Sequence, residues 1–570
     1  MSSPRRVRRL ATGIAIVLLT ATVVVATPAS ASLPSAQAPV ASAVQTRLSW
    51  SGCYRDITAA SGGTPYECAT AQVPLDYDAP NGAAVQLAVV RIPARDQAHK
   101  IGSLFLNPGG PGGSGVDFAL FFGPVAELFW GSEVRDRFDI VGFDPRGVGR
   151  STALRCFGNV RQSTQVFAPF AFPLTPEEEA IVAAGDALLA RQCAQRGGKI
   201  AAHMSTANVA RDLDRLRAAA GDAQLNYVGL SYGTFLGTTY ANMFPDHVRA
   251  VVVDGVLDPV AWVNVEGEIP FSTRLRSDAG AQMTLEKFFE LCDAAGARCA
   301  FGPDSANRFA DLTDRLRVEP VLATDPVTGE QFLVTYQDLI GFTLGSLYDP
   351  FSFPFLAELL AVVEASASPL TIGQAFNRLV GANGLVNKRG FPHYPNFVEA
   401  FPAVACEDSN NPTDYAVWSR QGALADANFG YFGRIWTWAS SPCAQWPFSD
   451  ADRYLGPFDH ETSNPVLVIG NLYDPATRYE GAVTVHGLLP NSALLTVDVP
   501  GHTSLGLSFC AGALTGQYLL DPASADSIDG ALCPPEFDPF ATGPAAAAAT
   551  HTQRDFRHSL LPIASFRPAR

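Results

Sequence analysis

Short apolar runs alternate with amphipathic segments over the first half of the chain. The apolar runs at 70–75, 85–92, 102–106, 138–143, 225–228 and 248–253 are of the kind found in buried strands. Segments with helical periodicity lie between them at 176–196, 206–220 and 232–244. Strands and helices in alternation, with short connections, predict an α/β fold built on a mostly parallel sheet.

This alternation stops at about residue 261. From there to 458, Phe-rich helical segments such as 281–295, 336–347 and 354–365 alternate with loops rich in Pro and Gly. We interpret the stretch as a large, mainly helical insertion that covers the active edge of the sheet as a cap. The strand–helix alternation returns with apolar runs at 464–470 and 493–499.

The pattern divides the chain into parts. We expect the first part of the core at 46–260, the cap at 261–458 and the second part of the core at 459–540. A loosely ordered tail is expected at 541–570. The length of 570 residues exceeds one ordinary domain, which agrees with a core that carries a large insertion.

The N-terminus has the composition of a signal peptide. Four Arg precede an apolar run from Leu10 to Ala26, and Ala29-Ser30-Ala31 forms a small-residue cleavage site. Residues 1–31 are therefore expected to be removed on export, with an uncleaved membrane anchor as the alternative. A flexible leader at 32–45 follows. No later segment is apolar enough to span a bilayer, so we expect a secreted or envelope-associated protein without stable membrane insertion.

The net charge of the chain limits the classes of partner that it can bind. It has 40 Lys and Arg against 55 Asp and Glu, and loss of the four Arg in residues 1–31 changes the net charge from −15 to −19. Such an acidic surface disfavours nucleic acid and anionic membranes as partners and tolerates cationic substrates. The sequence does not indicate an oligomeric state.

All cysteines lie after the predicted cleavage site, and their even number in an exported protein predicts disulfides. Neither a Cys-x-x-Cys pair nor a Cys/His cluster suggests a metal site. The sequence leaves the connectivity open. Pairing of neighbours is the expected arrangement, which gives 53–68, 156–193, 292–299, 406–443 and 510–533.

A Gly-x-Ser-x-Gly pattern, Gly229 to Gly233, lies between the strand at 225–228 and the helix at 232–244. This is the pattern of a nucleophile elbow, a tight strand-to-helix turn that exposes a serine hydroxyl. Glycine suits both ends because strand and helix pass so closely that side chains would collide. A chance match is the alternative in a chain rich in Gly and Ser, but the pattern occurs once and in the required context. We expect Ser231 to be the nucleophile.

A glycine-rich loop at 107–115 directly follows the strand at 102–106. It lacks the Lys-Ser/Thr of a P-loop and the spacing of a dinucleotide-binding loop, so no cofactor is expected. Backbone N–H groups can approach a reacting carbonyl only where side chains are absent, which favours an oxyanion loop over a plain tight turn. We expect the N–H groups of Gly110 and Tyr232 to form the oxyanion hole.

A serine nucleophile requires a base, and the base requires an acid that orients it. In α/β hydrolases these partners follow the serine in the order acid, then histidine. Asp474 comes just after the strand at 464–470, and His502 comes just after the strand at 493–499. Both are therefore candidate catalytic residues, and Thr477 could brace the acid or cap the next helix.

Other polar residues at strand ends are weaker candidates. Asp254 ends the strand at 248–253 and is the main rival for the acid, although a structural turn is its expected role. Asp144 and Arg146 follow the strand at 138–143 and are expected to brace a turn. His486 lies within a helical stretch.

Five segments together resemble the secreted tripeptidyl aminopeptidase-like branch of the proline iminopeptidase family of serine peptidases: 107–115, 144–151, 229–233, 471–477 and 501–503. The resemblance covers most of the mature chain. It implies an α/β-hydrolase core, a cap, a Ser-Asp-His triad and release of short peptides from free N-termini. Many relatives have His-Gly-Gly-Pro-Gly where this chain has Pro-Gly-Gly-Pro-Gly, a difference that spares the oxyanion loop because only backbone donates there.

An exopeptidase must also recognise the ammonium group of its substrate, which requires a carboxylate. Glu407 and Asp408, in the cap beside Cys406, are candidates for substrate binding, and a solvated acidic pair is an equally good interpretation. Peptides with a free N-terminus are the expected substrates. Two other functions stay open: a carboxylesterase or lipase with the same residues, and a non-catalytic envelope-associated binding protein.

Overall fold

The computed structural model describes residues 47–60, 63–324, 331–366 and 396–541. The predicted signal peptide at 1–31, the leader at 32–45 and the tail from residue 542 onward lie outside these residues. No helix in the described residues is long and apolar enough to cross a membrane.

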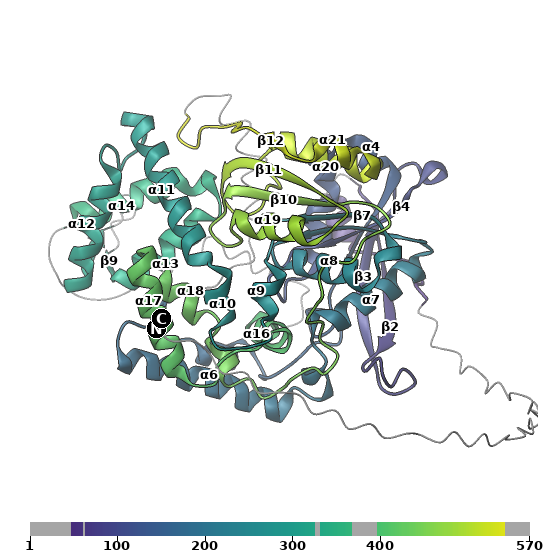
Figure 1. Cartoon of the computed structure of the whole chain (residues 1–570), viewed down its shortest axis with the longest axis horizontal. Coiled ribbons are helices and arrows are strands. Elements are labelled where there is room, and N and C mark those ends of the chain that lie inside the picture. Colours follow the sequence, from purple (N-terminus) through teal and green to yellow (C-terminus); the bar gives the residue numbers. More distant parts are fainter. Residues whose placement is uncertain (1–46, 61–62, 325–330, 367–395, 542–570) are drawn as a thin grey trace, which may run out of the picture. The chain divides into compact units, whose positions relative to one another are not determined.

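A ten-stranded sheet forms the centre of the core (Figure 1). Its order is β1-β2-β3-β5-β4-β6-β7-β10-β11-β12; the pairs β1–β2, β2–β3 and β3–β5 are antiparallel and the others parallel. The strands are β1 Ser51–Cys53, β2 Tyr66–Pro74, β3 Ala84–Ile92, β4 Gly102–Asn107, β5 Phe138–Phe143, β6 Leu225–Leu230, β7 Val248–Asp254, β10 Val466–Tyr473, β11 Ser492–Pro500 and β12 Ala531–Cys533. The predicted mostly parallel sheet of an α/β fold is confirmed. The central strands β4, β5 and β6 are buried at every position, as expected for strands covered on both faces.

Helices pack on both faces of this sheet. One face contacts α7 Thr206–Ala220, α8 Tyr232–Met243 and α19 Tyr479–Leu488. The other contacts α2 Gly115–Phe122, α3 Ala126–Trp130, α4 Ser132–Arg137, α20 Phe509–Leu520 and α21 Ala525–Ile528. The helical segment after the glycine-rich loop is interrupted between α2 and α3, where Pro124 lacks the N–H group that a continuous helix needs.

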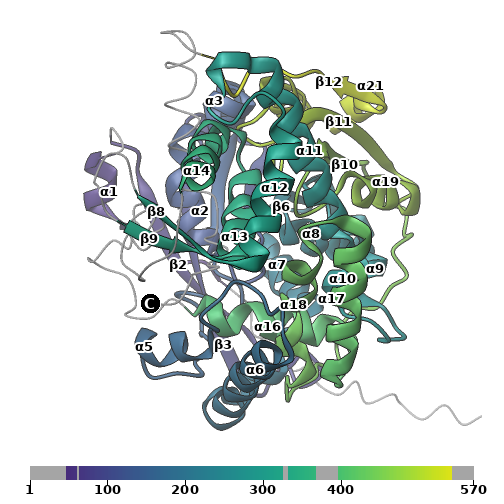
Figure 2. The same cartoon turned by 90° about the vertical axis from the view of Figure 1, so that its left-hand side faces the viewer.

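The cap helices lie beside the sheet core (Figure 1 and Figure 2). The cap has its own apolar core, in which Phe288, Phe309, Leu344 and Phe353 are fully buried. Its helices are α9 Pro259–Val263, α10 Phe271–Leu275, α11 Ser277–Ala295, α12 Ser305–Val318, α13 Tyr336–Leu347, α14 Phe353–Ala365, α16 Phe397–Asp408, α17 Tyr415–Phe429 and α18 Gly433–Trp438. A short hairpin, β8 Val321–Thr324 and β9 Gln331–Val334, adds strands that the sequence pattern did not predict.

A segment from the first part of the chain also joins the cap. Between β5 and α7 lie two helices, α5 Val160–Ser163 and α6 Pro176–Arg196. Helix α1 Arg55–Ala60 lies earlier in the chain, between β1 and β2. Helix α6 contacts the cap through polar bonds: Tyr415 donates to Asp186 at 2.9 Å, and Gln337 donates to Glu178 at 3.0 Å. The cap side of the molecule is therefore built from segments that lie both before and after Ser231 in the chain.

Five disulfides join neighbouring cysteines, as the sequence predicted: 53–68, 156–193, 292–299, 406–443 and 510–533. Each closes a local loop of 7 to 37 residues. The 156–193 bridge fixes the end of α6, and the 406–443 bridge fixes α16 to the segment after α18.

Candidate active site

Ser231 occupies the turn between β6 and α8 with φ of 57° and ψ of −125°, a conformation that is costly for a residue with a side chain. A Cβ atom at Gly229 would lie 2.2 Å from the carbonyl oxygen of Gly233, and one at Gly233 would lie 2.8 Å from the carbonyl oxygen of Asn107. Both glycines are thus required by close packing, as the sequence pattern predicted. The turn holds Ser231 at the edge of a cavity.

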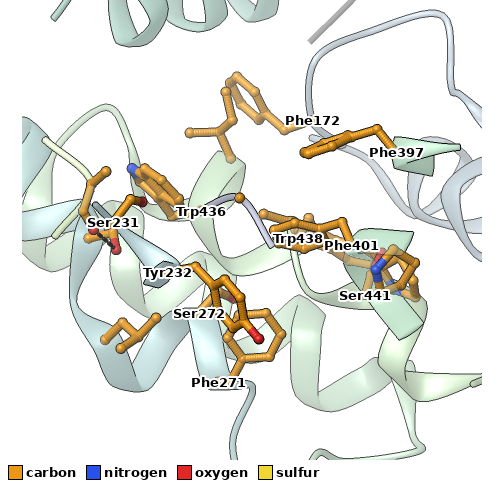
Figure 3. A pocket seen from close by; sticks show the side chains of 18 of the residues that line it. Phe172, Ser231, Tyr232, Phe271, Ser272, Phe397, Phe401, Trp436, Trp438 and Ser441 are labelled. Atoms are coloured by element: carbon orange, nitrogen blue, oxygen red, sulfur yellow. Dashed lines mark hydrogen bonds between the residues drawn. The ribbon is translucent and has the colours of Figure 1, made fainter. Parts of the chain in front are cut away.

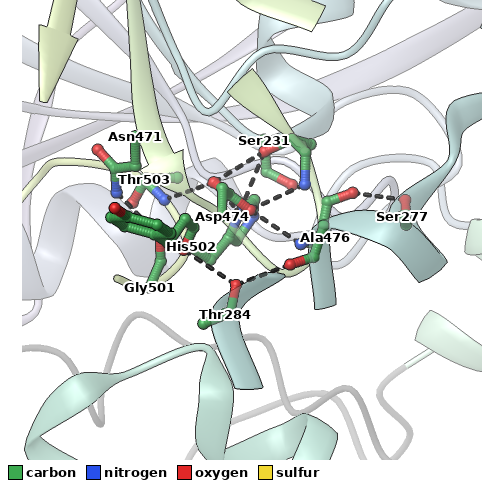
Figure 4. Close-up of polar contacts among 12 residues, drawn as sticks. Ser231, Ser277, Thr284, Asn471, Asp474, Ala476, Gly501, His502 and Thr503 are labelled. Carbon is green, nitrogen blue, oxygen red and sulfur yellow. Dashed lines mark hydrogen bonds and ion pairs between the residues drawn. The ribbon is translucent and has the colours of Figure 1, made fainter. Parts of the chain in front are cut away.

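Asp474 and His502 come together from the ends of neighbouring strands β10 and β11 (Figure 4). His502 Nδ1 lies 2.9 Å from each carboxylate oxygen of Asp474. With Nδ1 facing Asp474 in this way, Nε2 is the ring nitrogen on the side away from the carboxylate. Figure 4 places Ser231 beside this pair, so the structure brings all three predicted residues to one place.

The environment keeps Asp474 ionised. Burial raises its pKa, but the charge of His502, its hydrogen bond and the N–H groups of Thr477 and Ala476 outweigh burial, so the net shift is downward. The hydroxyl of Thr477 donates to Asp474 Oδ2 at 3.0 Å and lies 3.2 Å from His502 Nδ1. Thr477 therefore braces the acid, one of the two roles its position suggested.

Asp254, the rival acid, has different partners. It accepts hydrogen bonds from the N–H and hydroxyl of Ser504 and from the N–H of Leu505. Burial raises its pKa to about 6. These contacts fix the loop after His502, which agrees with the structural role expected for Asp254.

The other strand-end residues also brace turns. Asp144 accepts hydrogen bonds from the Ser114 hydroxyl at 2.5 Å and from the N–H of Arg150 at 2.7 Å. Arg146 pairs with Asp212 through two of its nitrogens, and both side chains are fully buried.

The glycine-rich loop lies directly against the elbow. A Cβ atom at Gly109 would lie 2.4 Å from the carbonyl oxygen of Leu230 and 2.9 Å from the nitrogen of Tyr232. Gly110, the next residue, lines the same cavity as Ser231 and Tyr232. Tyr232 is the first residue of α8, where backbone N–H groups have no acceptor within the helix. Two backbone donors beside a serine can stabilise an oxyanion.

A cavity of about 390 Å³ extends from Ser231 beneath the cap (Figure 3). This volume is within the usual range for small-molecule sites. Large aromatic side chains dominate its wall, among them Phe172, Trp262, Phe271, Phe397, Phe401, Trp436 and Trp438. The site therefore offers an apolar surface to whatever chain occupies it.

Tyr348, a cap residue immediately after α13, is not marked by any sequence motif. Its ring meets the His502 ring edge to face, with centroids 5.2 Å apart, and its backbone carbonyl accepts a hydrogen bond from the backbone N–H of His502 at 3.0 Å. The cap thus contacts the candidate base directly. A lone Tyr without a motif carries no signal that could have identified it.

Glu407 and Asp408 lie outside the residues that line the cavity. Both are buried at the end of α16, where Glu407 accepts the N–H of Met204 and Asp408 accepts the N–H and hydroxyl of Thr206. Trp262, a cavity residue, donates to Asp408 from the other side at 3.3 Å. The expectation that these two carboxylates face the substrate is therefore wrong, because neither lines the cavity. The alternative of a solvated pair is wrong as well, because both side chains are buried.

Comparison with known proteins agrees with this geometry. Residues 102–319 match the α/β hydrolase fold family, and residues 427–533 match a family described as TAP-like protein. The chain is 32% identical over 509 residues to the tripeptidyl aminopeptidase of Streptomyces coelicolor, with 88% of each chain covered. It is 34% identical over 497 residues to carboxylesterase B of Mycobacterium tuberculosis, covering 85% of this chain and 90% of that one. It is 33% identical over 449 residues to serine protease Hip1 of the same organism, covering 76% and 81%.

The fold and these similarities define the protein as an enzyme, a serine hydrolase with the α/β hydrolase fold. Within that class the chain belongs to the tripeptidyl aminopeptidase-like family of serine peptidases.

Proposed function

We propose that this protein is a secreted serine exopeptidase that releases short peptides from free N-termini by way of an acyl-enzyme. The observation that carries the proposal is the Asp474–His502 pair beside Ser231, at one end of a cavity that the cap covers. The names of two relatives, tripeptidyl aminopeptidase and serine protease, support cleavage of peptides.

In the proposed reaction, Ser231 attacks the scissile carbonyl carbon while His502 Nε2 accepts the hydroxyl proton. Asp474 holds the imidazole in the required tautomer and stabilises the imidazolium that forms. The N–H groups of Gly110 and Tyr232 stabilise the oxyanion. His502 then gives its proton to the leaving amine, and water, activated by the same histidine, hydrolyses the ester to release the peptide.

A carboxylesterase is the second candidate, because one relative carries that name and the cavity is apolar. Purified enzyme assayed on mono-, di- and tripeptidyl anilides, free and N-acetylated, and on p-nitrophenyl esters distinguishes the two. A peptidase hydrolyses free-amine anilides in preference to acetylated ones. An esterase cleaves the esters without regard to an N-terminal block.

Ser231→Ala tests the nucleophile. We expect a loss of kcat of about 10⁴-fold or more, because the oxyanion hole and binding alone provide only residual catalysis. The variant should also fail to react with a fluorophosphonate probe. Near-full activity or labelling of Ser231→Ala would exclude this serine, and absence of labelling in the wild type would favour a non-catalytic binding protein.

Export is proposed from the N-terminal composition and the disulfides, which persist in oxidising compartments. Mass spectrometry of protein from the culture medium and cell envelope should find a mature N-terminus at Ser32. Intact Met1 on cell-retained protein would contradict this part of the proposal.

A further inference from the structure

One carboxylate lines the cavity, and no sequence motif marks it. Asp186 lies on α6, upstream of the nucleophile, and only 8% of its surface is exposed. Among the described residues that line the cavity, it is the single Asp or Glu. In a wall made mainly of aromatic and aliphatic side chains, a charged group of this kind needs a specific reason.

The contacts of Asp186 leave its charge without a counterpart. Tyr415 donates to its Oδ2 at 2.9 Å, and the hydroxyl of Ser441 donates a second hydrogen bond. Within the described part of the chain, these hydroxyls and burial are the influences on its pKa, and no cation is among them. Burial raises that pKa to about 7. A carboxylate has further lone pairs that can accept donors from a ligand.

Its place relative to the nucleophile is equally informative. Figure 3 shows Ser231 at one end of the cavity and Ser441, the hydrogen-bond partner of Asp186, at the other end. Trp436, Trp438 and Phe401 lie between them. A peptide whose acyl carbon is at Ser231 would therefore extend along an apolar wall toward a carboxylate.

We propose, building on the peptidase function above, that Asp186 binds the free α-ammonium group of the substrate and thereby fixes which peptide bond reaches Ser231. The ammonium supplies the cation that the site lacks, and its three N–H donors suit an anchor made of a carboxylate and a hydroxyl oxygen. Because an extended chain advances about 3.3–3.6 Å per residue, an anchor at fixed distance from Ser231 selects the length of the released peptide.

The test compares Asp186→Asn with the wild type on tri-alanyl p-nitroanilide, free and N-acetylated, and on p-nitrophenyl butyrate. We expect the free-amine substrate to lose roughly 10- to 100-fold more kcat/KM than the acetylated one, mainly through KM, because a charge-assisted hydrogen bond is lost. Asp408→Asn is the matched control, since it removes a buried carboxylate behind the same wall and should leave the ratio of the two substrates unchanged.

A second readout is the length of the product. Wild-type enzyme should release one uniform length from a decapeptide with a free N-terminus, and Asp186→Asn should release mixed lengths, as seen by mass spectrometry. Ser441→Ala, a milder change at the same anchor, should lower the free-to-acetylated ratio several-fold and serves if Asp186→Asn does not fold.

The outcomes separate this inference from the proposed function. If the wild type prefers free amines and both Asp186→Asn and Ser441→Ala keep that preference, Asp186 is not the anchor. If only Asp408→Asn lost the preference for free amines, Asp408 on α16 would be the group that binds the ammonium, and the inference for Asp186 would be wrong. A wild type that ignores N-acetylation would overturn the peptidase proposal itself, before any variant is made.

Discussion

Asp186 lines the cavity and Asp474 lies behind the lining residue His502; both carboxylates are buried, yet their pKa values shift in opposite directions. Burial raises the pKa of each, but at Asp474 the charge and hydrogen bond of His502 outweigh it and the net shift is downward. At Asp186 two hydroxyl donors do not offset burial, and the pKa rises to about 7. A partner that can become a cation therefore decides in which direction the pKa of each of these two buried acids shifts.

Asp254 shows that position alone does not explain the difference. It lies at the catalytic end, close to Asp474, but its donors are the Ser504 and Leu505 groups and its pKa is raised to about 6. The two ends of the cavity also differ in construction. The catalytic end is built from the ends of sheet strands, whereas the far end is built from α6 and cap helices.

The largest effect is expected from amide substitution of Asp474 and Asp254, the two buried acids near Ser231. Asp474→Asn should lower kcat by about 10⁴-fold, because the amide favours the wrong imidazole tautomer and cannot stabilise the imidazolium. Asp254→Asn should change kcat far less and lower the free energy of unfolding by about 1–3 kcal/mol, since an amide NH₂ would face backbone donors. Steady-state kinetics and urea unfolding measure both, and equal kinetic losses would refute the assignment of roles.

A second test uses the sign of the pKa shifts. Burial raises the pKa of Asp408 to about 7 against a usual value near 3.9, so between these pH values the folded protein binds a proton that the unfolded chain has released. This group therefore lowers stability as pH rises from about 4 to about 7. Asp474, with a lowered pKa, contributes stability that is present above pH 4 and is lost as pH falls.

Asp408→Asn should accordingly flatten the decline of the melting temperature between pH 4 and pH 7, although loss of an acceptor for Thr206 lowers stability at every pH. Differential scanning calorimetry across this range measures the slope. The matched control is Asp56→Asn, at an exposed position on α1, which should keep the wild-type slope. A steeper slope in Asp408→Asn would contradict the direction of the shift.

The sequence pointed to Ser231, Asp474 and His502 as a candidate triad because each of them follows a buried strand in a recognisable pattern. Ser231 is marked by two glycines that packing requires, and Asp474 and His502 by the strands that precede them. The far end has no such marks. Asp186 is a single side chain on α6 whose place depends on contacts between distant parts of the chain. The same holds at the other end for Tyr348, a single side chain after α13 that contacts His502.

Glu407 and Asp408 illustrate the same limit. Two adjacent acids beside a cysteine suggest a position on the protein surface. In the structure, however, α16 directs them to the start of α7, whose first N–H groups need acceptors. Nothing local in the sequence encodes that the two helices meet there, because the meeting depends on the tertiary packing of the cap against the core. The fold class and the candidate triad were thus predictable, whereas the wall that would select a substrate was not.

The smallest expected effect concerns Thr477, whose hydroxyl lies within hydrogen-bond distance of both Asp474 and His502. Thr477→Val keeps the shape and the backbone N–H donor but removes the hydroxyl that lies 3.0 Å from Asp474 and 3.2 Å from His502. We expect kcat to fall roughly 3- to 20-fold, the cost of one hydrogen bond, with KM unchanged. As a positioning residue it acts on the base, so anilide and ester substrates should lose equally, and the rate of fluorophosphonate labelling should fall by the same factor. Thr484→Val, which removes a hydroxyl bonded only within α19, should leave all three rates at wild-type values. A change in KM alone would instead assign Thr477 to the cavity wall, where it also lies.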